Sequence, residues 1–100
     1  MENLNLYQGI HLIKKTSKSL PKKSGIYKMI SSKNQVLYIG KAKDISKRVH
    51  SYSNPMKLNY RLQKMVSLIK NIEYIITKDE AHALLLEANL IKEVKPKFNI

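Results

Sequence analysis

The stretch GIYKMISSKNQVLYIGK, residues 25–41, decides the fold that we predict for this chain. It contains two short runs rich in Ile, Val, Leu and Tyr, separated by the polar residues SSKN. That pattern predicts an antiparallel β-hairpin, and the type of turn is open because no Asn-Gly pair is present. If the hairpin closes symmetrically at Ser32-Lys33, Tyr27 stands directly opposite Tyr38 on one face of the sheet, whereas a bulge would change this register.

Hydrophobic spacing and breakers predict the elements around the hairpin. A T-x-x-E capping box formed by Thr77 and Glu80 predicts the start of the last helix. The expected order is a helix at 4–15, strands at 25–30 and 35–39, helices from 44 and across 58–69, a strand at 72–77 and a helix at 79–93. This order predicts a small α+β domain with a three-stranded antiparallel sheet flanked by helices.

The chain is expected to have one main domain. We assign residues 1–20 to an N-terminal helical extension and residues 21–100 to the domain itself. The sequence ends at Phe98-Asn99-Ile100 without a polar tail, so we expect the natural chain to continue and this to be the N-terminal domain of a longer protein.

Charge is the strongest global signal of the composition. Nineteen Lys and Arg against seven Asp and Glu give a net charge of +12, which favours a polyanionic partner such as nucleic acid. A Lys-rich solubilising surface, an anionic membrane surface and an acidic protein are the alternatives. The chain has no cysteine, no apolar run of membrane-spanning length and no secretory signal, and we expect it to be soluble and cytoplasmic.

Several candidate functional residues lie near the hairpin in the expected fold. Gly40 and Lys41 end its second strand, and Arg48 follows on the next helix. Glu87 lies on the last helix with apolar residues three and four positions away on both sides, so its carboxylate needs a partner. That partner is either Arg48 or Lys41 in a buried salt bridge, or a divalent metal ion held by one carboxylate, waters and phosphate oxygens. The tyrosines are either a catalytic pair or an aromatic pair that stabilises the hairpin.

At these residues the sequence resembles the GIY-YIG nuclease family. Gly25-Ile26-Tyr27 and Tyr38-Ile39-Gly40 match the two triplets that name the family, and KAKDISKRVHSY and EAHALLLEANLIKEVKPKFNI continue the similarity. LYIGKAK, ALLLEANLI and KPKFN are most similar to the excinuclease C branch of that family. The turn lacks a glycine often found before the second strand, and Phe98 stands where a tyrosine is common.

The resemblance implies roles for individual side chains. Glu87 is expected to bind one Mg²⁺ or Mn²⁺ ion. Tyr38 is expected to be the general base or to orient the attacking water, with Tyr27 as its hydrogen-bonding neighbour, and which tyrosine is the base stays open. Arg48 is expected to clamp the scissile phosphate and Lys41 to tune the tyrosine and contact phosphate. Tyr52 and Asn99 are expected to line the substrate site, although Tyr52 also fits the apolar face of its helix and Asn99 a terminal turn.

The resemblance implies a metal-dependent DNA endonuclease of nucleotide excision repair. It would hydrolyse a phosphodiester on the 3′ side of a lesion, on DNA presented by the damage-recognition protein, excinuclease B, and contacted through its backbone with little sequence specificity. A stand-alone structure-specific nuclease of the same family is the first alternative. A nucleic-acid-binding module without catalysis is the second.

Overall fold

A computed structural model describes the backbone of residues 2–99 and the side chains of residues 5–99. The chain forms four α-helices, three β-strands and two short 3₁₀ turns within these residues. Their order is α1 Glu2–Ser17, β1 Gly25–Ser31, β2 Val36–Ala42, α2 Ile45–His50, η1 Ser51–Ser53, η2 Pro55–Lys57, α3 Tyr60–Leu68, β3 Ile69–Ile76 and α4 Glu80–Val94. The strands form one antiparallel sheet in the order β2-β1-β3, which confirms the predicted α+β class and three-stranded sheet.

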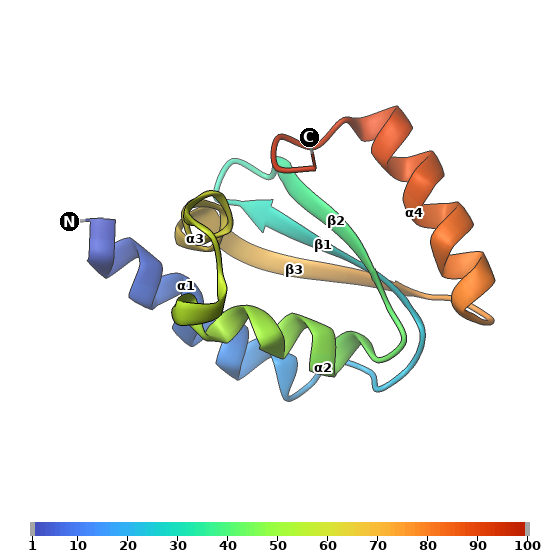
Figure 1. Cartoon of the computed structure of the whole chain (residues 1–100), viewed down its shortest axis with the longest axis horizontal. Coiled ribbons are helices and arrows are strands. Elements are labelled where there is room, and N and C mark those ends of the chain that lie inside the picture. The colour runs from blue at the N-terminus through green and yellow to red at the C-terminus, as the bar shows by residue number, and fades with distance from the viewer. Residues whose placement is uncertain (1, 100) are drawn as a thin grey trace.

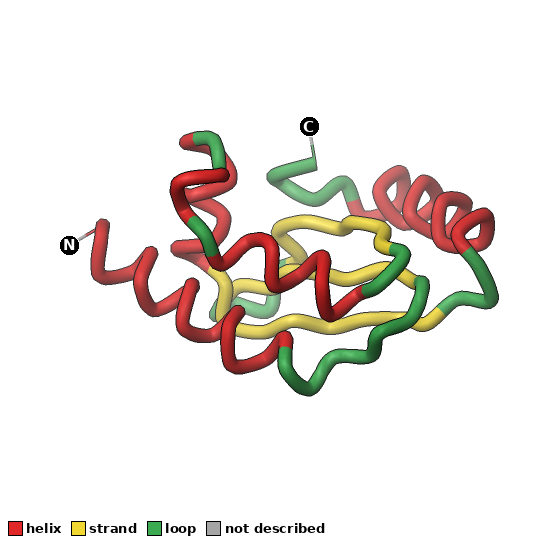
Figure 2. Tube along the Cα trace, turned by 60° about the horizontal axis from the view of Figure 1, so that its bottom comes forward, coloured by secondary structure: helices red, strands yellow, loops and turns green. Residues whose placement is uncertain are grey.

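Helices lie on both sides of the sheet. Helices α1 and α2 lie side by side over one face, with α3 packed on α1, while α4 lies apart from them against β2 and β1 (Figures 1 and 2). On the other face from α1 and α2, Ile26 and Ile39 are buried, as is Ala83 of α4. The main core combines the sheet with all three helices of the first side and includes Ile10, Ile13, Tyr27, Met29, Ile45, Val49, Met65, Val66 and Ile72.

The register of the hairpin differs from the symmetric one predicted. Tyr27 stands opposite Gly40 and Tyr38 stands opposite Met29. The closing turn is one residue longer than predicted, with Ser31 bonded to Gln35, and a bulge next to Met29 shifts the pairing by one residue more. The predicted direct pair Tyr27–Tyr38 is therefore wrong. The two tyrosines nevertheless share a face, since each is an even number of residues from a common cross-strand pair.

Gly40 leaves room for an aromatic side chain. A Cβ at this position would collide with the ring of Tyr27. The glycine opens the space through which Tyr27 crosses strand β2, so the two motif triplets are linked by a steric fit.

The capping box predicted for the last helix is also absent. Asp79 is the N-cap of α4, and its carboxylate accepts a hydrogen bond from the backbone N–H of His82 at 2.9 Å. The Thr77 hydroxyl instead donates to the carbonyl of Asp79, and Glu80 forms an exposed ion pair with Lys43. Thr77 and Asp79 are both residues that can cap a helix, and Asp79, a strong N-cap residue, is the one that does so here.

None of the described helices has the length and hydropathy that a bilayer span requires. Helix α1 shares the core cluster with the sheet through Ile10 and Ile13. The division of the chain at residue 20 stays a prediction.

The fit between Gly40 and Tyr27 predicts that Gly40→Ala destabilises the fold. The added methyl group meets the buried ring of Tyr27, and such overpacking costs about 1–3 kcal/mol. Urea denaturation of the variant measures this loss. In a Tyr27→Leu background, where no ring crosses the glycine, the cost of Gly40→Ala should shrink by about 1 kcal/mol or more. Additive effects of the two substitutions would contradict the steric linkage.

Candidate active site

Three tyrosines form a cluster on the α2 side of the sheet. The ring centroids of Tyr27, Tyr38 and Tyr52 lie 6.2, 5.9 and 6.3 Å apart in the three pairs, at tilted or edge-to-face angles. The hydroxyl groups of Tyr27 and Tyr52 are hydrogen-bonded at 2.6 Å. Tyr27 and Tyr52 are buried, and Tyr38, on the edge strand β2, is partly exposed. The structure thus joins the two hairpin tyrosines to a third from η1.

Helix α2 brings Arg48 to the same cluster. The helix starts at Asp44, whose carboxylate caps the N–H of Lys47 at 3.0 Å, and it is anchored on the core through Ile45 and Val49. The spacing of four residues places the guanidinium of Arg48 over the ring of Tyr52, 5.4 Å from its centroid. That distance permits a cation–π contact, so the arginine is held near the phenols while its donors remain available.

Burial separates the protonation behaviour of the phenols. Desolvation raises the pKa of Tyr27 to about 12, against the opposing effects of the Tyr52 hydrogen bond and the Arg48 charge. Burial, together with Tyr27, also raises the pKa of Tyr52. Partial burial lowers the pKa of Arg48, but the nearby phenols outweigh this effect and raise it. Tyr27 and Tyr52 are therefore neutral near pH 7 in the free protein, while Arg48 carries its charge.

Glu87 of α4 reaches the outer edge of β2. Its Oε2 atom accepts a hydrogen bond from the backbone N–H of Lys41 at 2.9 Å. No ion pair to Glu87 occurs among residues 5–99, so the alternative of a buried salt bridge to Arg48 or Lys41 is not found. One carboxyl oxygen is anchored on the strand, and no cationic side chain of residues 5–99 pairs with the group.

This arrangement fits a divalent ion bound by a single carboxylate. No three His, Asp or Glu side chains gather into a cluster in the described part of the chain. A hard cation such as Mg²⁺ is commonly held by one or two carboxylates with waters and phosphate oxygens. The partly buried Glu87 offers the carboxylate. It is bonded to the N–H of Lys41, which lies three residues, or about 10 Å of strand, after Tyr38 on β2.

Asn99 closes the same edge of β2. Its Oδ1 accepts from the N–H of Ile39 and its Nδ2 donates to the carbonyl of Ile39, both at 2.8 Å. The N–H of Phe98 donates to the carbonyl of Leu37 at 2.9 Å. The contact of Asn99 with substrate stays a prediction, whereas its structural task is to fasten the C-terminal segment to the strand.

The side chain of Lys41 lies away from the phenols. Because strand side chains alternate, Lys41 points to the opposite face from Tyr38, and it lines a hollow of about 50 Å³ beside Glu80 and Ala83 of α4. Its tuning of the tyrosine stays a prediction. The contribution visible in the structure is its backbone N–H, a donor that sequence reasoning did not identify because every residue except proline carries one.

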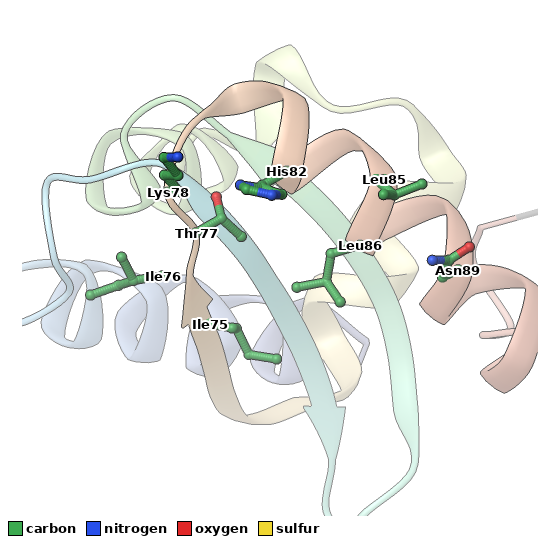
Figure 3. A pocket seen from close by; sticks show the side chains of 8 residues that line it. All are labelled: Ile75, Ile76, Thr77, Lys78, His82, Leu85, Leu86 and Asn89. Carbon is green, nitrogen blue, oxygen red and sulfur yellow. The ribbon is translucent and has the colours of Figure 1, made fainter.

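A second hollow, of about 460 Å³, separates the end of β3 from α4 (Figure 3). Its walls are mainly apolar, with Ile75 and Ile76 on one side and Leu85 and Leu86 on the other. It contains none of the predicted site residues, so it lies outside the candidate active site.

The raised pKa of Tyr27 predicts a pH-dependent stability. Unfolded tyrosine ionises near pH 10, so the wild type should lose stability as the pH rises from about 10 to about 12, by up to about 1.4 kcal/mol per pH unit from Tyr27, with a further loss from Tyr52, whose pKa is also raised. Tyr27→Phe removes one of these two groups and should make the slope shallower in denaturation experiments over that range. Tyr7→Phe, at a ring that is 64% exposed, is the matched control and should keep the slope of the wild type. Equal slopes for Tyr27→Phe and the wild type would contradict the burial argument.

Comparison with known proteins matches this geometry to one family. The model of the UvrC-like GIY-YIG domain matches residues 23–100. UvrABC system protein C of Gluconobacter oxydans is 50% identical over 93% of this chain, and that of Rhodospirillum rubrum is 42% identical over 93%. The chain spans 14% and 15% of the lengths of these two relatives.

A solved structure shares the fold over most of this chain. The GIY-YIG N-terminal endonuclease domain of UvrC from Thermotoga maritima, bound to its catalytic magnesium ion, matches with a TM-score of 0.79 and 35% identity, over 88% of this chain and 96% of that one. A tyrosine-to-phenylalanine point mutant of that domain, also bound to its catalytic divalent cation, matches with a TM-score of 0.78. The sequence match and the shared fold agree, and the chain belongs to the UvrC-like GIY-YIG domain family.

Proposed function

We propose that this domain is a metal-dependent DNA endonuclease that makes the incision on the 3′ side of a lesion in nucleotide excision repair. The observation that carries the proposal is the position of the Glu87 carboxylate. One of its oxygens accepts a hydrogen bond from Lys41, on the strand that bears Tyr38, and it forms no ion pair among residues 5–99. Membership of a family that includes a magnesium-bound endonuclease domain supports the same chemistry.

Glu87 would hold the divalent ion, Mg²⁺ or Mn²⁺. When bound, such an ion supplies Lewis-acid stabilisation of negative charge on the phosphate and the leaving oxygen. The hydrogen bond from Lys41 fixes the direction of the carboxylate, so this ligand needs no reorganisation when substrate arrives.

The phenol cluster and Arg48 would act on the opposite side of the phosphate. Arg48 presents a forked set of donors that suits the nonbridging oxygens of a phosphodiester. Tyr38 is partly exposed, so its hydroxyl can orient the attacking water, or its oxygen can accept the proton of that water after ionisation to the phenolate. Tyr27 and Tyr52 remain neutral and hydrogen-bonded to each other, so they position Tyr38 and Arg48 rather than take the proton.

The biological setting is inferred from the relatives. They are components of a UvrABC system and are several times longer than this chain. We infer that the domain works in the cytoplasm as part of such a protein, and that excinuclease B presents the damaged DNA to it. The net charge of +12 suits the contact with DNA backbone.

Two alternatives can be separated from this proposal. A stand-alone GIY-YIG nuclease would nick branched or flapped DNA without excinuclease B. A non-catalytic binding module would bind DNA but never nick it. Such a module would have no use for Glu87, Tyr38 and Arg48 together.

Glu87→Gln should abolish Mg²⁺-dependent nicking and preserve the fold. The amide oxygen still accepts from Lys41, but the negative charge that holds the ion is lost, so the rate should fall by at least about 100-fold. A nicking assay on a lesion-containing duplex with excinuclease B, with chelator as the blank, measures this. Glu93→Gln, at an exposed acid of the same helix, should nick like the wild type. Full activity of a folded Glu87→Gln variant would refute the metal role.

Tyr38→Phe should slow nicking by about 10²- to 10⁴-fold, the range for loss of a general base. Binding of the ion should persist because the hydroxyl is not its carboxylate ligand, and titration with Mn²⁺ checks this. Arg48→Ala should also abolish nicking while the fold is kept. If Tyr38→Phe nicks DNA like the wild type, Tyr38 is not the general base and another group accepts the proton.

A further inference from the structure

A basic groove lies on the flank of α2 that faces away from the phenol cluster. It has a volume of about 500 Å³ and lies between the end of α1 and α2, which run side by side in Figure 1. Given the helical repeat of 3.6 residues, Arg48 projects about 100° around α2 from Lys47 and about 160° from His50. The groove is lined by Ser17, Lys18, Lys22, Asp44, Ser46, Lys47 and His50.

Hydrogen bonds hold the two walls of this groove together. The hydroxyl of Ser46 donates to the carbonyl of Ser17 at 2.6 Å, and the N–H of Ser46 donates to the carbonyl of Pro21 at 3.1 Å. The ring of His50 contacts the hydroxyl of the buried Ser17 at 3.3 Å. The backbone positions from which the lysines extend are therefore fixed relative to one another before any ligand binds.

The groove carries a net positive charge, with three lysines against one aspartate. Lys18, Lys22 and Lys47 are exposed, and none of them forms an ion pair among residues 5–99. The single acid of the lining, Asp44, uses its carboxylate to cap the N–H of Lys47. Three unpaired ammonium groups around one concave surface attract a polyanion, and their flexible stems suit phosphates rather than base edges.

We propose that this groove binds backbone phosphates of the DNA that is cleaved at Arg48. The inference rests on the proposed function, because it takes the substrate to be DNA. Helix α2 with its side chains is about 10–12 Å wide, which corresponds to about three nucleotides at 3.4 Å per step. A duplex with its scissile phosphate at Arg48 thus reaches the groove with phosphates a few nucleotides away, and α2 is the ridge that it crosses.

The salt dependence of DNA binding tests the groove. The variant Lys18→Ala/Lys22→Ala/Lys47→Ala is compared with Lys64→Ala/Lys70→Ala/Lys92→Ala, in which three exposed lysines of α3, β3 and α4 are removed. Fluorescence anisotropy with a short labelled duplex in chelator gives the affinity at several salt concentrations. Each lost phosphate contact reduces the magnitude of the slope of log K against log salt by about 0.9. The slope of the groove variant should therefore be smaller in magnitude by about 2–3, and the variant should bind at least about tenfold more weakly at low salt.

The outcomes separate this inference from the proposed function. Equal losses in both triple variants would mean that only net charge matters and would overturn the groove. An unchanged slope in the folded groove variant would do the same, even if the wild-type domain nicks DNA. A wild-type domain that binds DNA through the groove but never nicks it, with excinuclease B and Mg²⁺ supplied, would overturn the endonuclease and leave the groove standing.

Discussion

The hydrogen bonds along the free edge of β2 are the constraint on which the site depends. An antiparallel strand exposes N–H and C=O groups at alternate residues of its outer edge, and those at Leu37, Ile39 and Lys41 are used by Phe98, Asn99 and Glu87. The C-terminal segment thus replaces part of a fourth strand. The same contacts hold α4 against the sheet and aim its carboxylate at the strand that carries Tyr38. The contacts that satisfy the sheet edge therefore also position Glu87, the proposed metal ligand.

The three phenols of the cluster differ in burial, and this difference separates their roles. Tyr27 crosses β2 at Gly40 and bonds to Tyr52, and both rings are removed from water. Their protons are therefore retained near neutral pH, which leaves them as rigid supports. Tyr38 lies at the edge, where water and phosphate can reach it. A site made of three phenols needs such a difference in exposure if one of them is to act on a water molecule.

Much of the fold could be predicted from the sequence, since hydrophobic spacing, turn residues and proline positions locate the elements. The errors have local physical causes. The register of Tyr27 was wrong because the closing turn is one residue longer than predicted and a bulge adds a second shift, and each of them changes every later pair of the hairpin. The cap of α4 was wrong because Thr77 and Asp79 compete for one position, and the sequence holds no measure of which backbone geometry wins. The cluster of Tyr27, Tyr38 and Arg48 could be expected from the resemblance of the motifs, but the contacts of Lys41 and Asn99 with the strand could not.

By itself, the sequence determined the α+β class, the hairpin, the basic charge and the isolation of Glu87 on an apolar helix face, because these follow from residue types and their spacing along the chain. Only the tertiary structure decided which groups meet. The pairing of Tyr27 with Gly40, the use of the Lys41 N–H by Glu87 and the groove between α1 and α2 all join segments distant in sequence. Backbone N–H groups carry no signature in a sequence, and the distance between two helices is set by the core packed beneath them.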